Sequence, residues 1–579
     1  MSEGAAAQET DVIVIGSGAG GLAAAVTAAQ RGLKVLVLEK DTVYGGTTAR
    51  SGGVLWIPAN GINGPRSDAD VRAAREYLVR ECGEALFDAG RVDAFLANGP
   101  RMVDFFSSQT SVQFAPLPAY PDYHPDEPGA VPGGRSIMAA PFDARELGPR
   151  MKALRPPLKE ITFVGMMFNS SQEIQHFFKV TRSLRSAVYV ARRLMAHGTE
   201  MLRYRRATRL TNGNALAARL AKSAFDLGAE LWLDAPALRL VTQGDGRVTG
   251  VVARHPETKA DVHIRARRGV VLACGGFPQD VARRRALFSH APTGAEHHSP
   301  APATNTGDGI SMGIAAGGVF EDSLPNPAAW IPVSLVPRGK APHGVFPHLI
   351  DRYKPGVIAV NPAGRRFVNE SNSYHDVGIA MRREAGHAAA VAWLVCDHTA
   401  LRRYGLGHVK PFPLPLWPQL RSGYLLRGAT LEALARRIGI DPAALQQTVA
   451  EYNRHAEQGE DPAFGRGSTA YNRYLGDHDH APNPCVAPIT RAPFYALRVT
   501  VGDLGTFAGL RTNERAQVID ARGAPVPGLY AAGNDSLSVM GGNYPGAGIT
   551  LGPAMTFGFI AGEQLAALQM QPTETAHAG

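Results

Sequence analysis

Three glycines near the N-terminus have the spacing of a turn that binds a dinucleotide. They are Gly16, Gly18 and Gly21, in the run Gly-Ser-Gly-Ala-Gly-Gly. In such a loop the first glycine permits a tight turn, the second lets the backbone approach a pyrophosphate, and the third lets a helix pack closely on a strand. Glu39 follows at the point where a carboxylate would bind ribose hydroxyls. The pattern predicts a site for a nucleotide cofactor.

The residues around this loop have the order of elements that the site requires. An apolar, β-branched run over Asp11 to Ile15 predicts a strand, and an alanine-rich stretch from Leu22 to Gln30 predicts a helix. A second apolar run, Lys34 to Leu38, ends directly before Glu39. The helix would present its N-terminus to the phosphates.

The C-terminal part of the chain distinguishes FAD from NAD. A predicted strand after Gln517 ends at Gly533 and Asn534, and a glycine-rich loop then enters a long apolar helix. A second half-site of this kind is expected where a flavin ring must be held from another side, whereas a simple NAD domain has no need of it. We therefore expect FAD, with the following contact residues: Gly16, Gly18, Gly21, Glu39, Lys40, Gly46, Thr47, Thr48, Gly53, Ala237, Gly275, Asp308, Gly533, Asn534 and Leu551.

The 579 residues are too many for one compact domain. A helical pattern over 213–228, strands around 230–240 and 247–254, and a buried strand over 269–277 indicate that the dinucleotide-binding domain is interrupted and then resumed. We predict an α/β fold in which a discontinuous Rossmann-type FAD-binding domain carries an inserted α+β catalytic cap. The predicted parts are the FAD-binding domain (1–150, 212–333 and 502–570), a basic, partly apolar helical insertion (151–211), the cap (334–501) and a C-terminal tail (571–579).

The four cysteines and the N-terminus indicate the compartment. Cys82, Cys274, Cys396 and Cys485 are far apart, without a CxxC pair, and are interpreted as free thiols in a reducing compartment. The first ten residues lack the pattern of a signal peptide, and no apolar run is long enough to span a bilayer. We expect a cytoplasmic protein. The histidines have no spacing that predicts a metal site.

The net charge of +9 is concentrated in residues 151–211, which contain twelve basic and three acidic residues. Phenylalanines interleave with these charges on a predicted helix that continues through Arg203. One interpretation is a peripheral contact with the anionic inner face of the membrane. The alternative is a solvated helical hairpin or a subunit contact. Nucleic-acid binding is not predicted, because no recognised motif accompanies the charge.

Three further motifs carry a resemblance to a known family. They are GGTTARSGGVLWIPAN from Gly45, GRRFVNESNSYHD from Gly364, and GGNYPGAGITLGPAMTFG from Gly541. With these motifs the chain resembles the fumarate reductase and succinate dehydrogenase flavoprotein superfamily, and within it the 3-ketosteroid Δ1-dehydrogenases. The resemblance extends over nearly the whole chain except 151–211.

The departures from the dicarboxylate members are also informative. Fumarate reductases carry an arginine in the C-terminal motif, where this chain has Asn543-Tyr544-Pro545-Gly546, and another shortly after the glutamate that matches Glu370. A dicarboxylate substrate would therefore lose both its clamp and its proton donor. The histidine motif that attaches flavin covalently is replaced by Gly45-Gly46-Thr47-Thr48, which implies non-covalent FAD.

Removing two vicinal hydrogens beside a ketone needs a donor to the carbonyl, a base for the α-hydrogen and a flavin for the β-hydrogen. Tyr544 and the backbone N–H of Gly548 could converge on one carbonyl oxygen as an oxyanion hole. By resemblance Tyr374 is the base, and a second tyrosine hydrogen-bonds to it. We predict Tyr123 in that role, with Tyr120 as its rival. Hydrogen bonds must lower the pKa of the base, or proton transfer must be concerted with hydride loss.

The resemblance implies an FAD-dependent enzyme that introduces a double bond into the A ring of a 3-ketosteroid. An unidentified electron acceptor, for which a quinone is the candidate, would reoxidise the flavin. The alternatives are a dehydrogenase of another bond, such as the Δ4-(5α) position, or of another cyclic ketone, and an electron-carrying flavoprotein subunit of a membrane-bound complex.

Overall fold

The computed structural model describes residues 8–168, 173, 176–177, 179–181 and 183–568. Phe178 and Arg182 of the basic segment, and the predicted tail 571–579, lie outside the described residues. Within the described residues the largest sheet has eight strands and is mixed, with parallel pairing between β11, β1, β2, β8 and β21. In the order of the sheet its strands are β20 (Gln517–Ile519), β21 (Pro525–Ala531), β11 (Asp261–Leu272), β1 (Gln8–Ile15), β2 (Val35–Leu38) and β8 (Glu230–Trp232), while β10 (Val248–Arg254) pairs with β11 and β9 (Ala237–Thr242) pairs with β10.

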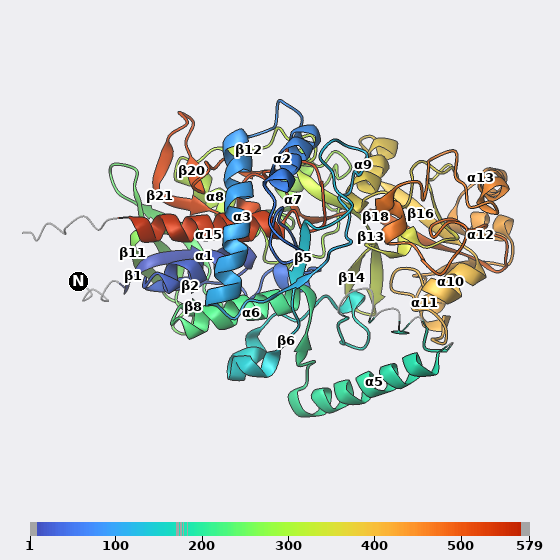
Figure 1. Cartoon of the computed structure of the whole chain (residues 1–579), viewed down its shortest axis with the longest axis horizontal. Coiled ribbons are helices and arrows are strands. Elements are labelled where there is room, and N and C mark those ends of the chain that lie inside the picture. The colour runs from blue at the N-terminus through green and yellow to red at the C-terminus, as the bar shows by residue number, and fades with distance from the viewer. Residues whose placement is uncertain (1–7, 169–172, 174–175, 178, 182, 569–579) are drawn as a thin grey trace, which may run out of the picture.

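Both faces of this sheet are buried, so its central strands are apolar without alternation. Val12 and Val14 of β1 belong to one hydrophobic core, and Ile13 and Ile15 belong to a second core on the opposite face. The first core contains helices α1 (Ala19–Gln30), α6 (Asn212–Asp226), α3 (Ala89–Gln109) and α15 (Leu551–Ala567), which lie beside one another in Figure 1.

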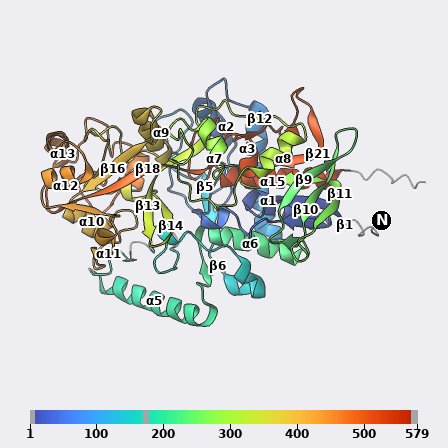
Figure 2. The same ribbon diagram turned by 180° about the vertical axis from the view of Figure 1, so that it is seen from behind.

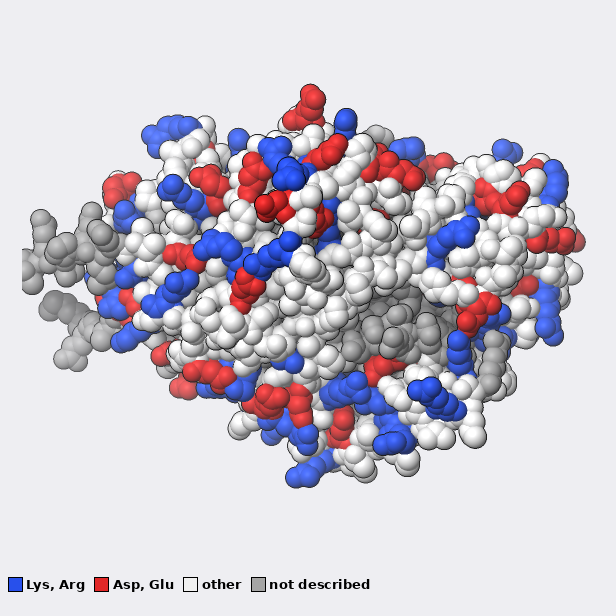
Figure 3. Space-filling model, in the orientation of Figure 1, with Lys and Arg blue, Asp and Glu red and all other residues white. Residues whose placement is uncertain are grey.

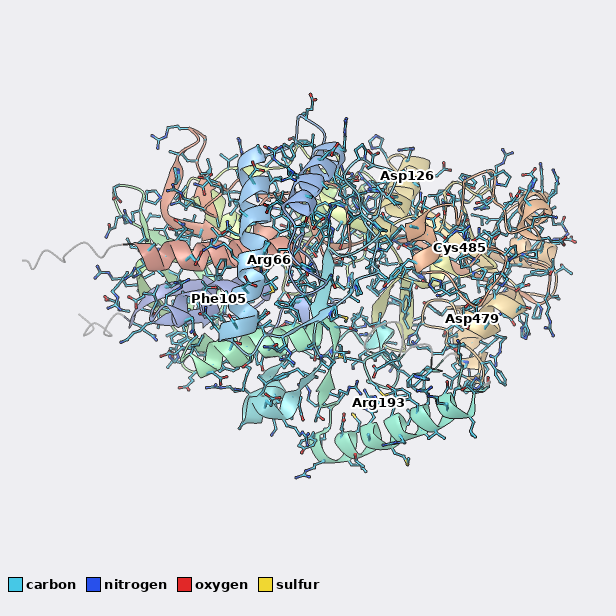
Figure 4. All side chains as sticks on the ribbon, in the orientation of Figure 1. Arg66, Phe105, Asp126, Arg193, Asp479 and Cys485 are labelled. Atoms are coloured by element: carbon cyan, nitrogen blue, oxygen red, sulfur yellow. The ribbon has the colours of Figure 1, made fainter. Side chains whose placement is uncertain are left out.

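The close packing of α1 against α15 depends on glycine. A Cβ atom at Gly558 would lie 2.3 Å from the carbonyl oxygen of Gly20, and one at Gly562 would lie 2.6 Å from Cβ of Thr27. Phe105 of α3, labelled in Figure 4, packs on Phe559 of α15 with ring centroids 5.3 Å apart. The first and last helices of the domain are thus joined side by side.

The second large sheet is antiparallel and lies at the other end of the molecule (Figures 1 and 2). Its strands follow the order β14 (Ala341–Pro347), β13 (Ala328–Arg338), β18 (Phe494–Thr506), β16 (Val391–Cys396) and β15 (Val357–Val360), and β17 (Leu426–Gly428) pairs with β18. The helices of this region are α9 (Tyr374–Ala385), α10 (His398–Tyr404), α11 (Trp417–Arg421), α12 (Leu431–Ile438), α13 (Pro442–Ala456) and α14 (Ala470–Tyr474). We refer to it as the cap.

Shorter elements connect these parts. Small sheets are formed by β3 (Val54–Trp56), β5 (Ser136–Ala139) and β4 (Phe114–Pro116), by β6 (Phe142–Asp143) and β7 (Arg209–Leu210), and by β12 (Phe320–Glu321) and β19 (Gly509–Leu510). Further α-helices in the described residues are α2 (Asp68–Cys82), α5 (Leu184–Tyr204), α7 (Val281–Leu287) and α8 (Asp308–Ala315). The 3₁₀ helices there are η1 (Thr48–Arg50), η2 (Ala144–Ala153), η3 (Lys159–Ile161), η4 (Asp351–Tyr353) and η5 (Gly533–Asp535).

The predicted strand region 230–240 divides into two strands with different neighbours. The chain turns at Asp234, which has a positive φ of 53° and donates its N–H to the carbonyl oxygen of Asp41. β8 therefore extends the sheet beside β2, whereas β9 pairs with β10. Among the described residues, no helix combines the length and the apolarity that crossing a bilayer requires.

Candidate active site

A cavity opens where the carboxyl ends of β1, β2 and β11 meet, with roughly 1060 Å³ of space, part of it open to solvent. The N-termini of α1 and α15 both border the cavity, and neither helix has a side-chain cap at its N-terminus. The Ala19 N–H at the start of α1 donates to the Thr48 hydroxyl at 2.9 Å. Helix N-termini of this kind suit a ligand with phosphates and carbonyl oxygens.

The N-terminal glycine loop has the geometry that its spacing predicts. Gly16 has a φ of +107°, and a Cβ atom there would lie 2.2 Å from the carbonyl oxygen of Ala273. Gly18 borders the cavity at the start of α1. Gly21 does not line the cavity, because its Cα faces the carbonyl oxygen of Gly16, where a Cβ atom would lie at 2.1 Å. Helix and strand therefore approach through Gly21, as the third glycine of the motif requires.

Polar side chains organise the far wall of the cavity. The carboxylate of Glu39 accepts hydrogen bonds from the Ser17 hydroxyl at 2.5 Å and from the Asp41 N–H at 2.9 Å. Lys40 donates to Asp308 at 2.6 Å. Arg155 pairs with Asp41 at 2.7 Å, and its buried Nε has no hydrogen-bond partner among the described residues. An unpartnered donor on the wall of a cavity fits an anionic ligand group.

Most of the residues predicted to contact the cofactor line this one cavity: Gly16, Gly18, Glu39, Lys40, Gly46, Thr47, Thr48, Ala237, Gly275, Asp308, Gly533, Asn534 and Leu551. Gly53 does not, because it packs against the backbone of Asn212 and Gly213, and a Cβ atom there would lie 2.3 Å from the Asn212 carbonyl carbon. The sequence reasoning missed other lining residues, including Ser17, Arg155, Cys274, Thr304, Asn305 and Thr550. Thr304 and Asn305 could have been found from the sequence, because they lie just before a glycine and an acidic residue that mark the start of helix α8. The other four have no such local pattern.

Three tyrosines meet beside this cavity. The hydroxyl of Tyr123 donates to the hydroxyl of Tyr374 at 3.1 Å. The rings of Tyr123 and Tyr544 are stacked with centroids 5.5 Å apart, and Tyr374 meets Tyr544 edge-on at 5.0 Å. The Tyr544 hydroxyl also interacts with the side chain of Thr550, which lines the cavity, so the cluster adjoins the cofactor wall. All three rings are buried.

The rival tyrosine, Tyr120, occupies a different position. Its ring contacts Tyr474 at 4.6 Å and Tyr123 at 6.4 Å. No contact joins it to Tyr374 among the described residues. The structure thus brings Tyr123, Tyr374 and Tyr544 together and leaves Tyr120 behind them.

The turn that carries Tyr544 is fixed from several sides. The carbonyl oxygen of Pro545 accepts from the Tyr77 hydroxyl at 2.7 Å and from the Tyr123 N–H at 2.9 Å. Gly548 has a φ of +100° and approaches Val54 so closely that a Cβ atom would lie 2.5 Å from its carbonyl oxygen. Its N–H has no hydrogen-bond partner in the described part of the chain.

Tyr374 begins helix α9 and follows a buried, charged loop. Glu370 is fully buried and pairs with Arg366 at 2.8 Å and Arg466 at 3.1 Å. Arg352 donates to the carbonyl oxygens of Glu370 and Asn372. The buried arginines are therefore bonded to groups within the protein. Their contacts hold the loop that positions Tyr374.

His124 connects the loop that carries Tyr123 to the helix that begins at Tyr374. Its Nδ1 lies 2.6 Å from Glu81 and its Nε2 lies 3.0 Å from Asp376, which is in the first turn of α9. Burial opposes the charge of the imidazolium, but hydrogen bonds to Asp376 and Glu81 raise the pKa of His124 to about 11. The charged ring therefore ties the Tyr123 loop to the helix that begins at Tyr374.

Burial dominates the acidity of the tyrosines. Burial, followed by the proximity of Tyr123 and Tyr544, raises the pKa of Tyr374 well above its usual value of 10. Burial also raises the pKa of Tyr544. Free phenolates are thus disfavoured at neutral pH. Among the described residues, no group of three or more His, Cys, Asp and Glu side chains is arranged to hold a metal ion.

Comparison with known proteins identifies the cofactor. The sequence profile of a family described as FAD binding domain matches residues 11–551. The chain belongs to this family. It is 42 % identical to the 4-oxocyclohex-2-ene-1-carboxylate 5-dehydrogenase of Sinomonas cyclohexanicum, over 96 % of this chain and 94 % of that protein. It is 38 % identical to the 3-oxosteroid 1-dehydrogenase of Mycobacterium tuberculosis H37Rv, over 96 % and 98 %.

A solved structure agrees with these relatives. The 3-ketosteroid Δ1-dehydrogenase of Sterolibacterium denitrificans, in complex with 1,4-androstadiene-3,17-dione, superposes with a TM-score of 0.88 at 38 % identity, covering 97 % of this chain and 100 % of that one. The predicted fold class, the resemblance and the FAD cofactor are confirmed. The protein is an FAD-dependent oxidoreductase of the type that acts on CH–CH groups.

Proposed function

We propose that this protein is a 3-ketosteroid Δ1-dehydrogenase, which removes one hydrogen each from C1 and C2 of the steroid A ring. The observation that carries the proposal is the buried cluster of Tyr123, Tyr374 and Tyr544 beside the cofactor cavity. Together with the unpartnered N–H of Gly548, the cluster supplies a carbonyl donor and a base within one apolar site.

The carbonyl oxygen of the substrate would accept two hydrogen bonds, from the Tyr544 hydroxyl and the Gly548 N–H. These donors stabilise the negative charge that develops on oxygen when the α-hydrogen leaves. Burial strengthens them, because water does not compete for the oxygen. The neighbouring C2 hydrogen becomes acidic as a result.

Tyr374 would take the C2 proton on its hydroxyl oxygen. To act as a base Tyr374 must first release its own hydroxyl proton to solvent, and because burial raises its pKa the phenolate is a minor species at neutral pH. Removal of the C2 proton by this phenolate is concerted with loss of the C1 hydride. The hydrogen bond donated by Tyr123 supports the charge on Tyr374 as it develops. Bound FAD supplies the hydride acceptor.

The buried arginines argue against a dicarboxylate substrate. Arg352 donates to backbone carbonyls, and Arg466 pairs with Glu370 and donates to the Arg352 and Lys354 carbonyls. Neither guanidinium is free to clamp a substrate carboxylate. A neutral cyclic ketone is the better fit to this site.

A second candidate is a smaller ring ketone that carries one carboxylate, as the name of the Sinomonas relative at 42 % identity indicates for that protein. Arg50 favours this alternative. It lies between Thr48 and Ser51 of the cavity wall, donates to the Pro300 carbonyl at 2.9 Å, and forms no ion pair among the described residues. Burial, followed by nearby Arg155, lowers the pKa of Arg50 to about 10. A carboxylate would relieve this unpaired charge.

The test is anaerobic reduction of the bound flavin by androstenedione, followed at 450 nm, with identification of the 1,4-diene product. Tyr544→Phe should lower kcat by about 10²- to 10³-fold, the usual loss for one oxyanion-hole donor. Tyr452→Phe is the matched control, because its buried hydroxyl has no hydrogen-bond partner among the described residues. Equal rates in both variants would refute the assigned role of Tyr544.

The same assay separates the two substrate classes. A higher kcat/KM for 4-oxocyclohexanecarboxylate than for androstenedione, abolished in Arg50→Gln, would favour the carboxylated ring. A preference for the steroid that Arg50→Gln leaves unchanged supports the first proposal.

A further inference from the structure

Helix α5 (Leu184–Tyr204) exposes a stripe of large apolar side chains on the side that faces away from the protein. Leu184 is 82 % exposed, Val188 52 %, Met195 65 % and Leu202 87 %. Their spacing of four, seven and seven residues places them on one side of a helix. These four side chains are not part of the buried core.

A different face of the same helix is used for packing. Ser186, Val190 and His197 are its buried residues, and they too are four and seven positions apart. His197 binds the carbonyl oxygen of Val164 at 2.9 Å. A surface helix ordinarily has one apolar stripe, which faces the core. Contiguous apolar side chains on the outer side indicate a contact with something outside the chain.

Arginines border the stripe along one flank. Arg185, Arg192 and Arg203 are exposed and are spaced by seven and eleven residues, which again keeps them on one side. Within the described part of the chain, none of the three forms an ion pair. Figure 3 shows Lys and Arg side chains gathered at the lower edge of the molecule, over α5. The charge there is positive and available.

The helix is held at both ends and lies at the rim of the molecule. Before its N-terminus Lys179 pairs with Asp479 of the cap at 2.6 Å, and after its C-terminus β7 pairs with β6. Figures 1 and 2 both show α5 along one edge of the molecule, and Figure 4 places Arg193 on it and Asp479 on the neighbouring cap. Its 21 residues extend over about 32 Å at 1.5 Å per residue. This length can lie flat on a surface.

We propose that α5 is the docking surface of this protein for an anionic lipid bilayer. The apolar stripe enters the boundary between headgroups and acyl chains, and the three arginines bind lipid phosphates beside it. Since no described helix can cross a bilayer, the contact is parallel to the membrane plane. The proposal is independent of the substrate, and it gives a role to residues that the dehydrogenation does not use.

The combination of apolar and basic side chains favours an anionic bilayer over a nucleic acid or a second copy of the chain. A nucleic acid would contact the arginines but would leave Leu184 and Leu202 in water, because phosphates require no apolar stripe. A second copy of α5 could cover the stripe, but it would bring the arginine rows of two identical helices close together without acids to neutralise them. An anionic bilayer satisfies both features at once.

The experiment is sedimentation of the full-length holoenzyme with sucrose-loaded vesicles of phosphatidylcholine, with or without 30 mol % phosphatidylglycerol. We expect binding to the anionic vesicles that weakens with salt. Leu184→Ser with Leu202→Ser should lower the partition coefficient about 100-fold, at about tenfold for each large apolar side chain. Replacing Arg185, Arg192 and Arg203 by Gln should lower it by a similar factor, at about fivefold for each arginine.

The control variant is Val281→Ser with Phe412→Ser, because these side chains are each 52 % exposed on other surfaces. It should bind vesicles as the wild type does. The content of bound flavin, measured as the ratio of absorbance at 450 and 280 nm, should be equal in all variants, which establishes that each one is folded. Absence of binding to anionic vesicles, or binding that both α5 variants retain, would overturn the proposal. Dimers in sedimentation velocity that only the Leu184 and Leu202 variant loses would assign the stripe to a second copy instead.

Discussion

Replacing Tyr123 by Phe isolates a single hydrogen bond in the tyrosine cluster. The hydroxyl of Tyr123 is 3.1 Å from that of Tyr374, and the ring would keep its stacking on Tyr544 after the change. In the ground state both groups are neutral, and such a bond contributes about 0.5–1.5 kcal/mol. In the transition state Tyr374 carries a developing charge, and a hydrogen bond to a charged group contributes about 1.5–3 kcal/mol.

The difference between these two values is what the variant loses in kcat. With about 1 kcal/mol for the neutral bond, the loss is about 0.5–2 kcal/mol, which corresponds to about a 2- to 30-fold decrease in kcat at 25 °C. Tyr374→Phe removes the base itself and should cost about 10²- to 10⁴-fold. KM should change little in Tyr123→Phe, because its hydroxyl binds Tyr374 and is not assigned to the substrate.

The assay is single-turnover flavin reduction by androstenedione in the two single variants, the double variant and Tyr452→Phe. Because Tyr123 is expected to act only through Tyr374, the double variant should be no slower than Tyr374→Phe alone. Two results would refute this reasoning. One is a Tyr123→Phe enzyme with normal kcat and raised KM, and the other is a full Tyr123 effect in the absence of the Tyr374 hydroxyl.

Three further predictions concern stability and cofactor binding. His124 has a folded pKa of about 11, above the unfolded value of 6.5, so its stabilisation is complete below about pH 6.5 and is lost as the pH rises toward 11. The unfolding free energy of wild type relative to His124→Gln, from urea titrations, should therefore fall over this range, and a constant difference would contradict the ion pairs. Glu370→Gln leaves buried arginines without their carboxylate and should cost about 3–5 kcal/mol in the same measurement, against less than about 0.5 kcal/mol for the exposed control Glu432→Gln. Gly18→Val adds methyl groups at the cavity while its Cβ keeps an ordinary 3.7 Å contact with Thr48, so the chain should fold and retain under about a tenth of its FAD, measured as the ratio of absorbance at 450 and 280 nm.

The parts of the site that the sequence could predict are those with short-range signals. The turn at Gly16 follows from residue types that only a tight loop needs, and the helix that starts at Leu551 follows a glycine-rich run. Apolar strands buried on both faces gave continuous hydrophobic runs, from which β1, β2 and β11 could be located. Their pairing follows from the right-handed connections of such folds.

The contacts that could not be predicted join residues far apart in sequence. His124 meets Glu81 and Asp376, three residues that share no local pattern. Arg155 is similar. It lies in the segment that we interpreted as an insertion, yet it borders the cofactor cavity and pairs with Asp41. A basic segment gives no indication of which of its charges will be buried by the fold, because burial depends on distant acids.

The FAD-binding sheet is assembled from both ends of the chain, and this has a consequence for biosynthesis. β1 is made first, but its neighbour β11 lacks β21 until about residue 531, and α1 lacks α15 for longer still. At about 5–20 residues per second, the ribosome needs about 13–50 s to synthesise the residues between the end of β11 and the start of β21. During this time β11 remains an open, apolar edge of the kind that pairs with other chains. We therefore expect a message truncated before Gln517 to yield a product that neither closes its sheet nor retains flavin.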